Sequence, residues 1–186
     1  ISSGKDTVGS MIQYLTSECS NTKGKHFRTY QEFMDNGQGN NDFQTWYNSD
    51  YEIKKFAGKL KQVASLLTGI PIHKFEDQGF KKSELPKEWW TKEPNFELGK
   101  LVDGTQIMKD KPMTVREFLQ KLGTEAMRDG LHTNTWVNAL YSDFNTEYSK
   151  WIITDLRFPN ELKSVLDRNG ITIRVTRPGT QTGTHA

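Results

Sequence analysis

The chain has 186 residues, enough for one domain, or one domain with a subdomain, and for a sizeable buried core. Its 25 basic and 23 acidic residues leave a formal charge of only +2, which argues against a nucleic-acid coat or a membrane-binding surface. A single cysteine excludes an internal disulfide framework and fits a reducing, cytoplasmic compartment. No apolar run approaches the roughly 20 residues of a membrane span.

Residues 3–7 (Ser-Gly-Lys-Asp-Thr) match the second half of the phosphate-binding pattern G-x-x-x-x-G-K-[ST]. In such a loop, backbone N–H groups hold phosphates and the lysine reaches toward the β- and γ-phosphates. The first glycine and the preceding strand are absent, and an aspartate stands where serine or threonine is expected. Taken alone the motif is a weak signal, because a solvated turn before a helix would look the same. Since the sequence starts at Ile1 without a methionine, we expect the true N-terminus to lie further upstream.

An amphipathic helix is predicted over residues 7–19, because its apolar residues follow the i, i+3, i+4, i+7 pattern. The motif therefore lies at a helix N-terminus, where unpaired N–H groups and the helix dipole favour anions. The polar stretch 36–41 predicts a loop. A second helical period runs over residues 53–67, and Gly69 followed by Pro71 ends that helix.

The middle of the chain alternates charged stretches with turn and helix signals. Residues 73–95 are charged and contain prolines and tryptophans, which predicts a surface excursion. An Asp-Gly pair between short apolar stretches predicts a hairpin over residues 98–109. Thr114 and Glu117 form a capping box, so we expect a helix from there to about Arg128.

The last third of the chain predicts a strand–helix–strand unit. A short helix around Trp136 precedes the apolar run 151–155, a buried strand that ends in an acid. Pro159 then opens a helix that Gly170 closes, and residues 171–176 form another β-rich run. Such a unit predicts a parallel α/β sheet, which the first helix would join if a strand preceded it.

The polar residues of the first motif have two interpretations each. Lys5 could neutralise phosphate charge during transfer, or it could be an exposed lysine in a helix-starting turn. Asp6 could reach Mg²⁺ through water, or it could cap the helix. Thr7 carries the nearest hydroxyl and could serve either role.

Asp155 and Arg157 lie at the end of the predicted strand 151–155. In open α/β sheets ligands bind beyond the carboxyl ends of the strands, so an acid there can hold Mg²⁺ or orient a substrate hydroxyl. The alternative is an N-terminal cap for the helix that begins near Pro159. Two residues apart in extended backbone, the acid and the arginine point to one side, where they could form a salt bridge or clamp a phosphate.

A polar row runs through the helix that follows the capping box: Arg116, Gln120, Gly123, Thr124 and Arg128. Members spaced by four share one face, which could also be merely solvated. A glycine inside a helix costs about 1 kcal/mol relative to alanine, so Gly123 suggests close approach by a ligand or a neighbouring helix. Trp136 could stack on a nucleobase or belong to the core. None of the four histidines has metal-ligand spacing.

Together these pieces resemble the bacteriophage deoxynucleoside monophosphate kinases. The resemblance is carried, in chain order, by residues 3–7, 55–61, 116–125, 136–137, 153–161 and 174–179. The family's phosphate loop itself contains Gly-Lys-Asp-Thr. The resemblance implies a single domain over 1–186 with a P-loop NTPase-like, three-layer α/β/α fold. This fold would have a parallel central sheet and a helical substrate-binding and lid region. The N-terminal strand and the first half of the loop would be missing, and about 20–110 would be an insertion that binds the monophosphate.

The resemblance implies transfer of the γ-phosphate of ATP to a dNMP, with ATP and Mg²⁺ as cofactors. By position it assigns ATP phosphates to Ser3, Gly4, Lys5, Asp6 and Thr7, the dNMP to Lys61, Arg116, Gln120, Gly123, Thr124 and Trp136, Mg²⁺ to Asp6, Thr7 and Asp155, and catalysis to Lys5, Arg128, Asp155 and Arg157. Lys61, Asp155 and Arg157 would line one cleft, and residues after Arg177 would belong to a closing lid. Gly58 departs from the family, which often has aspartate there.

Two alternatives remain open at this point. One is another small-molecule P-loop kinase, acting on dephospho-coenzyme A or phosphomevalonate. The other is a catalytically inactive nucleotide-binding protein, which the incomplete loop permits. The expected partners are small-molecule nucleotides, with no nucleic acid and no membrane, and the oligomeric state is open, a homodimer included. The expected compartment is the cytoplasm, that of the host if the chain is phage-encoded.

Overall fold

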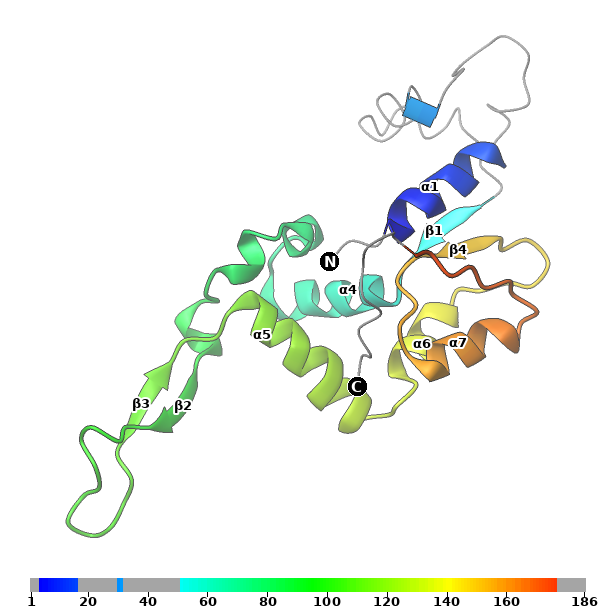
Figure 1. Ribbon diagram of the computed structural model, residues 1–186. Helices are drawn as coiled ribbons and strands as arrows, with labels where there is room; N and C mark the ends of the chain where they lie inside the picture. Colours follow the sequence, from blue (N-terminus) through cyan, green and yellow to red (C-terminus); the bar gives the residue numbers. More distant parts are fainter. Residues whose placement is uncertain (1–3, 17–29, 32–50, 177–186) are drawn as a thin grey trace. The chain divides into compact units, whose positions relative to one another are not determined.

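The computed structural model describes residues 4–16, 30–31 and 51–176 of the chain (Figure 1). It divides into two compact units, one made of Ile1–Gly58 with Trp136–Ala186 and the other of Lys59–Thr135. Ser3, the loop at 36–41 and the lid after Arg177 lie outside the described residues. The insertion expected at about 20–110 stays a prediction, because only part of that range is described.

The first unit contains a small parallel sheet. Strand β1 (Glu52–Lys54) pairs with β4 (Trp151–Ile153), with Ile53 opposite Ile152. Helix α1 (Lys5–Leu15) lies beside both strands. A Cβ atom added at Gly9 would lie 2.5 Å from Cγ2 of Thr154, so the missing side chain is what allows α1 to lie this close to the chain just after β4. The protein is thus a mixed α/β structure, and the three-layer arrangement stays a prediction.

Two helices follow in the same unit. Helix α6 (Thr135–Tyr141) buries Trp136, Val137 and Leu140, and α7 (Pro159–Leu166) begins at its proline as expected. The N–H of Gly170 donates to the carbonyl of Val165, which closes α7. Next to α6, the ring of Trp151 stacks on Tyr141 with centroids 5.8 Å apart.

Two sequence predictions in this unit are wrong. Ile53 lies in a strand, and the helix that was expected to include it, α4 (Phe56–Thr68), begins three residues later. Residues 171–176 form no strand, so the second strand of the expected strand–helix–strand unit is absent from the described chain. Ile171 and Ile173 are 89% and 64% exposed. Without a pairing strand or a buried face, an apolar β-prone run has nothing to stabilise it.

The second unit contains most of α4 and a series of short elements. These are the 3-10 helices η1 (Ile72–Glu76), η2 (Phe80–Lys82) and η3 (Lys87–Trp89), strands β2 (Thr91–Pro94) and β3 (Met108–Lys111), helix α5 (Val115–Gln120) and the π-helix η4 (Lys121–Asp129). The strands pair antiparallel, which confirms a hairpin around Asp103-Gly104, although its first strand begins at Thr91, before the predicted range 98–109. Thr114 accepts the N–H of Glu117 at 3.1 Å, which confirms Thr114 as the N-cap and thus the first half of the predicted capping box.

The core of this unit is drawn partly from the stretch expected to be a surface excursion. Phe75 and Leu85 are 0% and 3% exposed, and they pack with apolar residues of α4 and α5. The ring of Trp89 meets that of Phe118 edge-on at 4.9 Å. Charged residues between them set the composition of the stretch, but every few residues an apolar side chain turns inward. The predicted surface excursion thus holds for the exposed charged residues, whereas Phe75 and Leu85 belong to the core.

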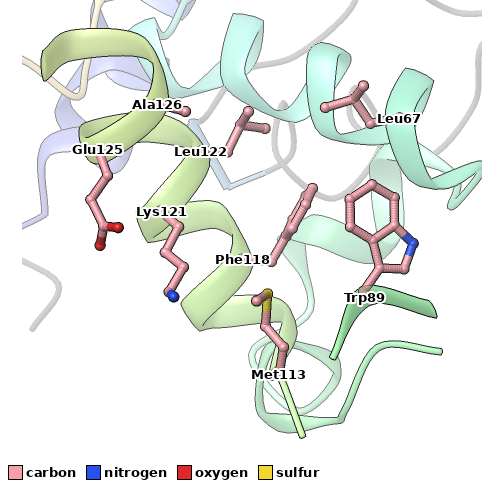
Figure 2. A pocket seen from close by; sticks show the side chains of 8 residues that line it. All are labelled: Leu67, Trp89, Met113, Phe118, Lys121, Leu122, Glu125 and Ala126. Carbon is pink, nitrogen blue, oxygen red and sulfur yellow. The ribbon is translucent and has the colours of Figure 1, made fainter. Parts of the chain in front are cut away.

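A hollow of about 530 Å³ lies on the second unit, lined mainly by apolar side chains (Figure 2). Its residues are Leu67, Trp89, Met113, Phe118, Lys121, Leu122, Glu125 and Ala126. No helix in the described part of the chain is both long and apolar enough to cross a membrane.

Candidate functional site

The first candidate site is the start of helix α1. Gly4 occupies the N-cap position with φ 81°, a left-handed conformation that glycine adopts without strain. Because glycine has no side chain, Gly4 cannot accept a hydrogen bond from the N–H groups of the first turn, as other N-cap residues do. Lys5, Asp6 and Thr7 are the first three helical residues. The predicted phosphate motif therefore lies at a helix N-terminus, as its sequence indicated.

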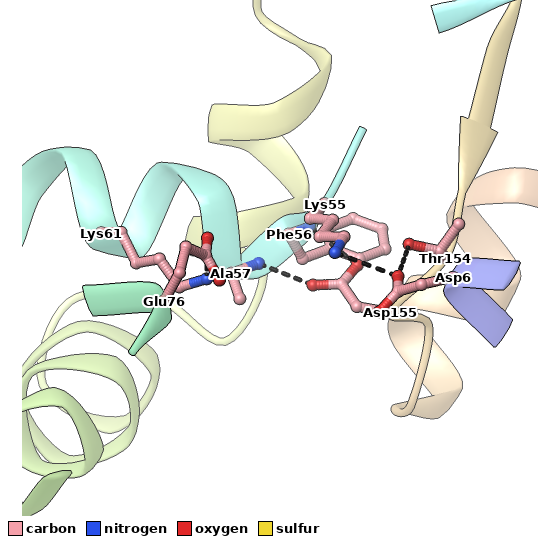
Figure 3. Close-up of polar contacts among 8 residues, drawn as sticks. All are labelled: Asp6, Lys55, Phe56, Ala57, Lys61, Glu76, Thr154 and Asp155. Atoms are coloured by element: carbon pink, nitrogen blue, oxygen red, sulfur yellow. Dashed lines mark hydrogen bonds and ion pairs between the residues drawn. The ribbon is translucent and has the colours of Figure 1, made fainter. Parts of the chain in front are cut away.

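Asp6 ties this helix start to the carboxyl ends of both parallel strands (Figure 3). Its Oδ1 accepts a hydrogen bond of 2.6 Å from the Thr154 hydroxyl, directly after β4. The same oxygen lies 3.0 Å from Nζ of Lys55, directly after β1. Burial acts to raise the pKa of Asp6, but the Thr154 and Lys55 hydrogen bonds and the charges of Lys55 and Lys5 outweigh it, so the pKa is lowered. Asp6 is thus a carboxylate held ionised.

Asp155 caps a helix, but a different one from the helix that the sequence suggested. Its Oδ1 accepts the N–H of Phe56 at 2.9 Å and its Oδ2 accepts the N–H of Ala57 at 2.8 Å, at the start of α4. The expected alternative, a cap for the helix near Pro159, is wrong. Burial raises the pKa of Asp155, the two N–H donors act against this, and the charge of Glu161 adds to it.

Glu161 performs the capping at α7. Its Oε2 accepts the N–H groups of Arg157 and Phe158 at 2.8 and 3.1 Å, and the residue is only 2% exposed. Sequence reasoning missed this residue, although a glutamate three positions after the N-cap is the second half of a capping box. The Arg157 backbone is thereby fixed, while its side chain is exposed.

The oxygen donors Asp6, Thr7 and Asp155 were predicted to hold Mg²⁺. The described residues contain no group of three or more His, Cys, Asp or Glu side chains that could hold a metal ion. Mg²⁺ commonly keeps several waters and takes one or two protein oxygens beside substrate phosphates. Asp6 and Thr7 at a helix start suit that arrangement, whereas both Asp155 oxygens already accept N–H groups.

The second candidate site is the polar row on α5 and η4. Arg116, Gln120 and Thr124 are exposed, and Arg128 is half-buried. The hydrogen bond of 3.0 Å from the N–H of Gly130 to the carbonyl of Glu125 spans five residues, as in a π-helix. A spacing of four residues is slightly more than one turn of an α-helix and slightly less than one turn of the wider π-helix. The change of helix type therefore keeps a row spaced by four on one face for longer.

The remaining predicted residues are buried. A Cβ atom added at Gly123 would lie 3.1 Å from Cδ2 of Leu60, so this glycine accommodates the neighbouring helix α4. Lys61, also on α4, is 8% exposed and pairs with Glu76. Trp136 is 4% exposed, which fits its packing role, and its contact with a nucleobase stays a prediction.

The structure thus gathers the predicted residues into two groups, one in each unit. The residues of α1 and the chain after β4 form the first group, and Lys61 with the α5–η4 row belongs to the second unit. A single cleft shared by Lys61, Asp155 and Arg157 stays a prediction. Sequence reasoning missed Lys55, Thr154 and Glu161, whose roles depend on contacts far along the chain.

An α/β protein with an anion-suited helix start at the carboxyl ends of parallel strands fits the general plan of nucleotide-binding proteins. More specifically, the chain belongs to the deoxynucleotide monophosphate kinase family, whose sequence model matches residues 2–186. A protein of Acanthamoeba polyphaga mimivirus named "Putative deoxynucleotide monophosphate kinase" is 32% identical over 94 residues, which cover 41% of this chain and 49% of that protein. The chain thus matches about half the length of this curated relative. No solved structure matches it significantly.

Proposed function

We propose that this protein is an ATP-dependent deoxynucleoside monophosphate kinase that converts a dNMP and ATP into a dNDP and ADP. The observation that carries the proposal is the attachment of Asp6 to Thr154 and Lys55, at 2.6 and 3.0 Å. This attachment puts the Gly-Lys-Asp-Thr motif at the edge of the sheet where ligands bind in α/β proteins. Family membership over nearly the whole chain supports the same reaction.

The ATP phosphates would lie against the N-terminus of α1 in a P-loop NTPase-like arrangement. The backbone of residues 4–7 would supply N–H groups, and Lys5 would offset charge on the transferring phosphoryl group. Asp6 and Thr7 would hold Mg²⁺, directly or through water; when bound, the ion neutralises phosphate charge. Because Lys55 and Thr154 already orient Asp6, its carboxylate needs little rearrangement on binding.

The dNMP would bind along the α5–η4 row. Arg116, Gln120 and Thr124 offer donors on one exposed face. Lys61 would add a positive charge from α4, the helix that Gly123 accommodates. Arg128 and Arg157 would offset the charge shared by donor, acceptor and transferring group. The acceptor is already a phosphate anion, so no strong general base is needed. Asp155 would act by positioning, since its carboxylate holds the start of α4.

The test is ADP release by the complete protein with dTMP, dGMP, dCMP and dAMP as acceptors. We expect turnover with one or more of them, and Lys5→Ala to lose about 100-fold or more in kcat with the fold intact. Lys100→Ala, an exposed lysine in the hairpin, is the matched control and should keep full activity. Retained turnover in Lys5→Ala would remove the role given to Lys5.

The same assay separates the alternatives. Turnover only with dephospho-coenzyme A or phosphomevalonate would assign the protein to another class of P-loop kinase. ATP binding without ADP release for any acceptor would favour a catalytically inactive nucleotide-binding protein.

A further inference from the structure

Three cationic side chains of the second unit lie in the segment 76–82 or contact it. Lys61 of α4 forms an ion pair with Glu76 at the end of η1. Lys81 lies in the middle of η2, five residues further along the chain. Arg116, the second residue of α5, donates to the side-chain oxygen of Gln78 at 3.4 Å. Four elements thus bring these groups to the segment 76–82.

Backbone hydrogen bonds fix this arrangement. The N–H of Val115 donates to the carbonyl of Ser83 at 3.0 Å, so the start of α5 is joined to the residue that ends η2. The N–H of Lys81 donates to the carbonyl of Asp77 at 3.1 Å, and the Asp77 carboxylate accepts the N–H groups of Gly79 and Phe80. The turn that presents Lys81 is therefore well ordered by its own contacts.

The charges in this cluster are not balanced by Glu76. Burial lowers the pKa of Lys81, the positive charges of Lys61 and Arg116 lower it further, and Glu76 and Asp77 act in the opposite direction. An added anion would favour the charged form of Lys81, which the neighbouring cations oppose. The Asp77 carboxylate is held in place by the turn, so Glu76 is the carboxylate that can exchange with another anion.

Exposure differs sharply between the two partners of the ion pair. The side chain of Lys61 is 10% exposed, whereas that of Glu76 is 59% exposed. A buried ammonium needs a partner at all times, but the partner can be exchanged if it is at the surface. Glu76 can turn into solvent, where a free carboxylate is well hydrated, and leave Lys61 to another anion.

We propose that Lys61, Lys81 and Arg116 bind the phosphate monoester of the acceptor nucleotide, and that Glu76 is a counter-ion which this phosphate displaces. A phosphate monoester carries up to two charges and three acceptor oxygens, and thus matches three cations better than one carboxylate does. An arginine fork with two lysines is a common way to hold such a group. The identity of the ligand rests on the proposed function; Lys81 and Glu76 are the residues that the cluster adds to it.

The experiment is calorimetric titration of the complete protein with each of the four dNMPs, with the corresponding deoxynucleosides, and with inorganic phosphate. Lys81→Met keeps the packing of the chain and removes the charge, and we expect it to weaken dNMP binding about tenfold, with Lys81→Arg restoring it. Lys82→Met, an exposed neighbour in the same helix η2, is the matched control and should change the Kd less than twofold. Deoxynucleosides should bind alike to all variants.

Glu76→Gln should change dNMP affinity in the opposite direction to Lys81→Met. The amide oxygen can still accept a hydrogen bond from Lys61, but it no longer competes as an anion, so dNMP binding should tighten several-fold. A merely structural ion pair would predict unchanged or weaker binding. Weaker or unchanged binding in Glu76→Gln, or an unchanged Kd in Lys81→Met, would overturn the proposal. So would a wild-type protein that binds neither dNMP nor inorganic phosphate.

Turnover separates this inference from the proposed function. If Lys81→Met raises the KM for the dNMP while kcat and the KM for ATP stay unchanged, the phosphate site and the kinase proposal both stand. If dNMPs bind with the expected signs but no ADP forms, the phosphate site stands and the kinase proposal fails. If Lys81→Met and Glu76→Gln both form ADP with the wild-type KM for the dNMP, the kinase proposal stands and the phosphate site fails.

Discussion

The carboxylate of Asp155 accepts a hydrogen bond of 2.9 Å from the backbone N–H of Phe56, a residue 99 positions earlier in the chain. A second bond of 2.8 Å runs from the N–H of Ala57 to the other carboxylate oxygen. These two N–H groups belong to the first turn of α4 and have no partner within the helix. The end of β4 thereby determines where α4 begins, in addition to the pairing of β4 with β1.

Removal of this cap should destabilise the protein. Asp155→Ala leaves both N–H groups without an acceptor, and a lost N-cap costs about 1–2 kcal/mol. Asp155→Asn should cost less, because one amide oxygen can still accept. The free energy of unfolding from urea titrations measures both. Asp167→Ala is the control: its exposed i, i+4 pair with Lys163 is expected to contribute less than about 0.5 kcal/mol. Equal losses at the two positions would contradict the capping role.

Asp6 and Asp155 should change stability with pH in opposite directions. The lowered pKa of Asp6 means that its stabilising effect is present above its ordinary value of 3.8 and is lost as the pH falls below it. The raised pKa of Asp155 means that the folded state holds its proton more tightly. Its contribution is therefore fully present below 3.8 and declines as the pH rises above that value.

The measurement is the free energy of unfolding from strongly acidic to neutral pH, for the wild type and for each asparagine variant. The wild-type advantage over Asp6→Asn should shrink as the pH falls through and below 3.8. Relative to Asp155→Asn, the wild type should lose stability as the pH rises above 3.8. Parallel curves for wild type and variant would contradict the corresponding pKa shift.

Local signals in the sequence predicted much of this fold correctly. The N-cap at Thr114, the glycine stop at Gly69 and the Asp-Gly hairpin depend on residues a few positions apart, and all three are present. By contrast, β1 is only three residues long and pairs with a strand about a hundred positions later. Ile53 also fits the helical period that follows, so only the distant partner decides its conformation.

The candidate site shows the same division. The helix start at residues 4–7 could be predicted, because a phosphate motif before an amphipathic run is a local pattern. Its attachment through Lys55 and Thr154 could not, since both contacts cross the chain. An acid after a strand predicts a capped helix, but which helix it caps depends on tertiary structure, as Asp155 demonstrates.

Gly9→Ala should destabilise the contact between α1 and the end of β4. The new methyl group would lie 2.5 Å from Cγ2 of Thr154, whose hydroxyl is held by Asp6 and cannot rotate away without loss of that bond. Overpacking of this kind costs about 1–3 kcal/mol, which exceeds the gain of about 1 kcal/mol from alanine in a helix. Thermal and urea unfolding measure the cost.

Gly58→Ala is the matched control for that substitution. Its added Cβ would lie 3.9 Å from Cβ of Lys55, an ordinary contact, so the same change inside α4 should stabilise the protein by about 0.5–1 kcal/mol. If Gly9→Ala were stabilising as well, the close approach of α1 to Thr154 would not limit packing.

Gly123→Ala tests why a glycine lies in the middle of the polar row. Its Cβ would lie 3.1 Å from Cδ2 and 3.7 Å from Cδ1 of Leu60, so α4, and not a ligand, is the neighbour that requires the missing side chain. The leucine tip can shift by a few tenths of an ångström, so we expect a loss of about 1 kcal/mol or less.

Leu60→Ala by itself should cost about 2 kcal/mol through the cavity that it leaves. In the double variant the new methyl group has room. Its loss of unfolding free energy should therefore be smaller than the sum of the losses in the two single variants, which a double-mutant cycle measures. Additive losses together with a raised KM for the dNMP would instead indicate that the glycine makes room for the substrate.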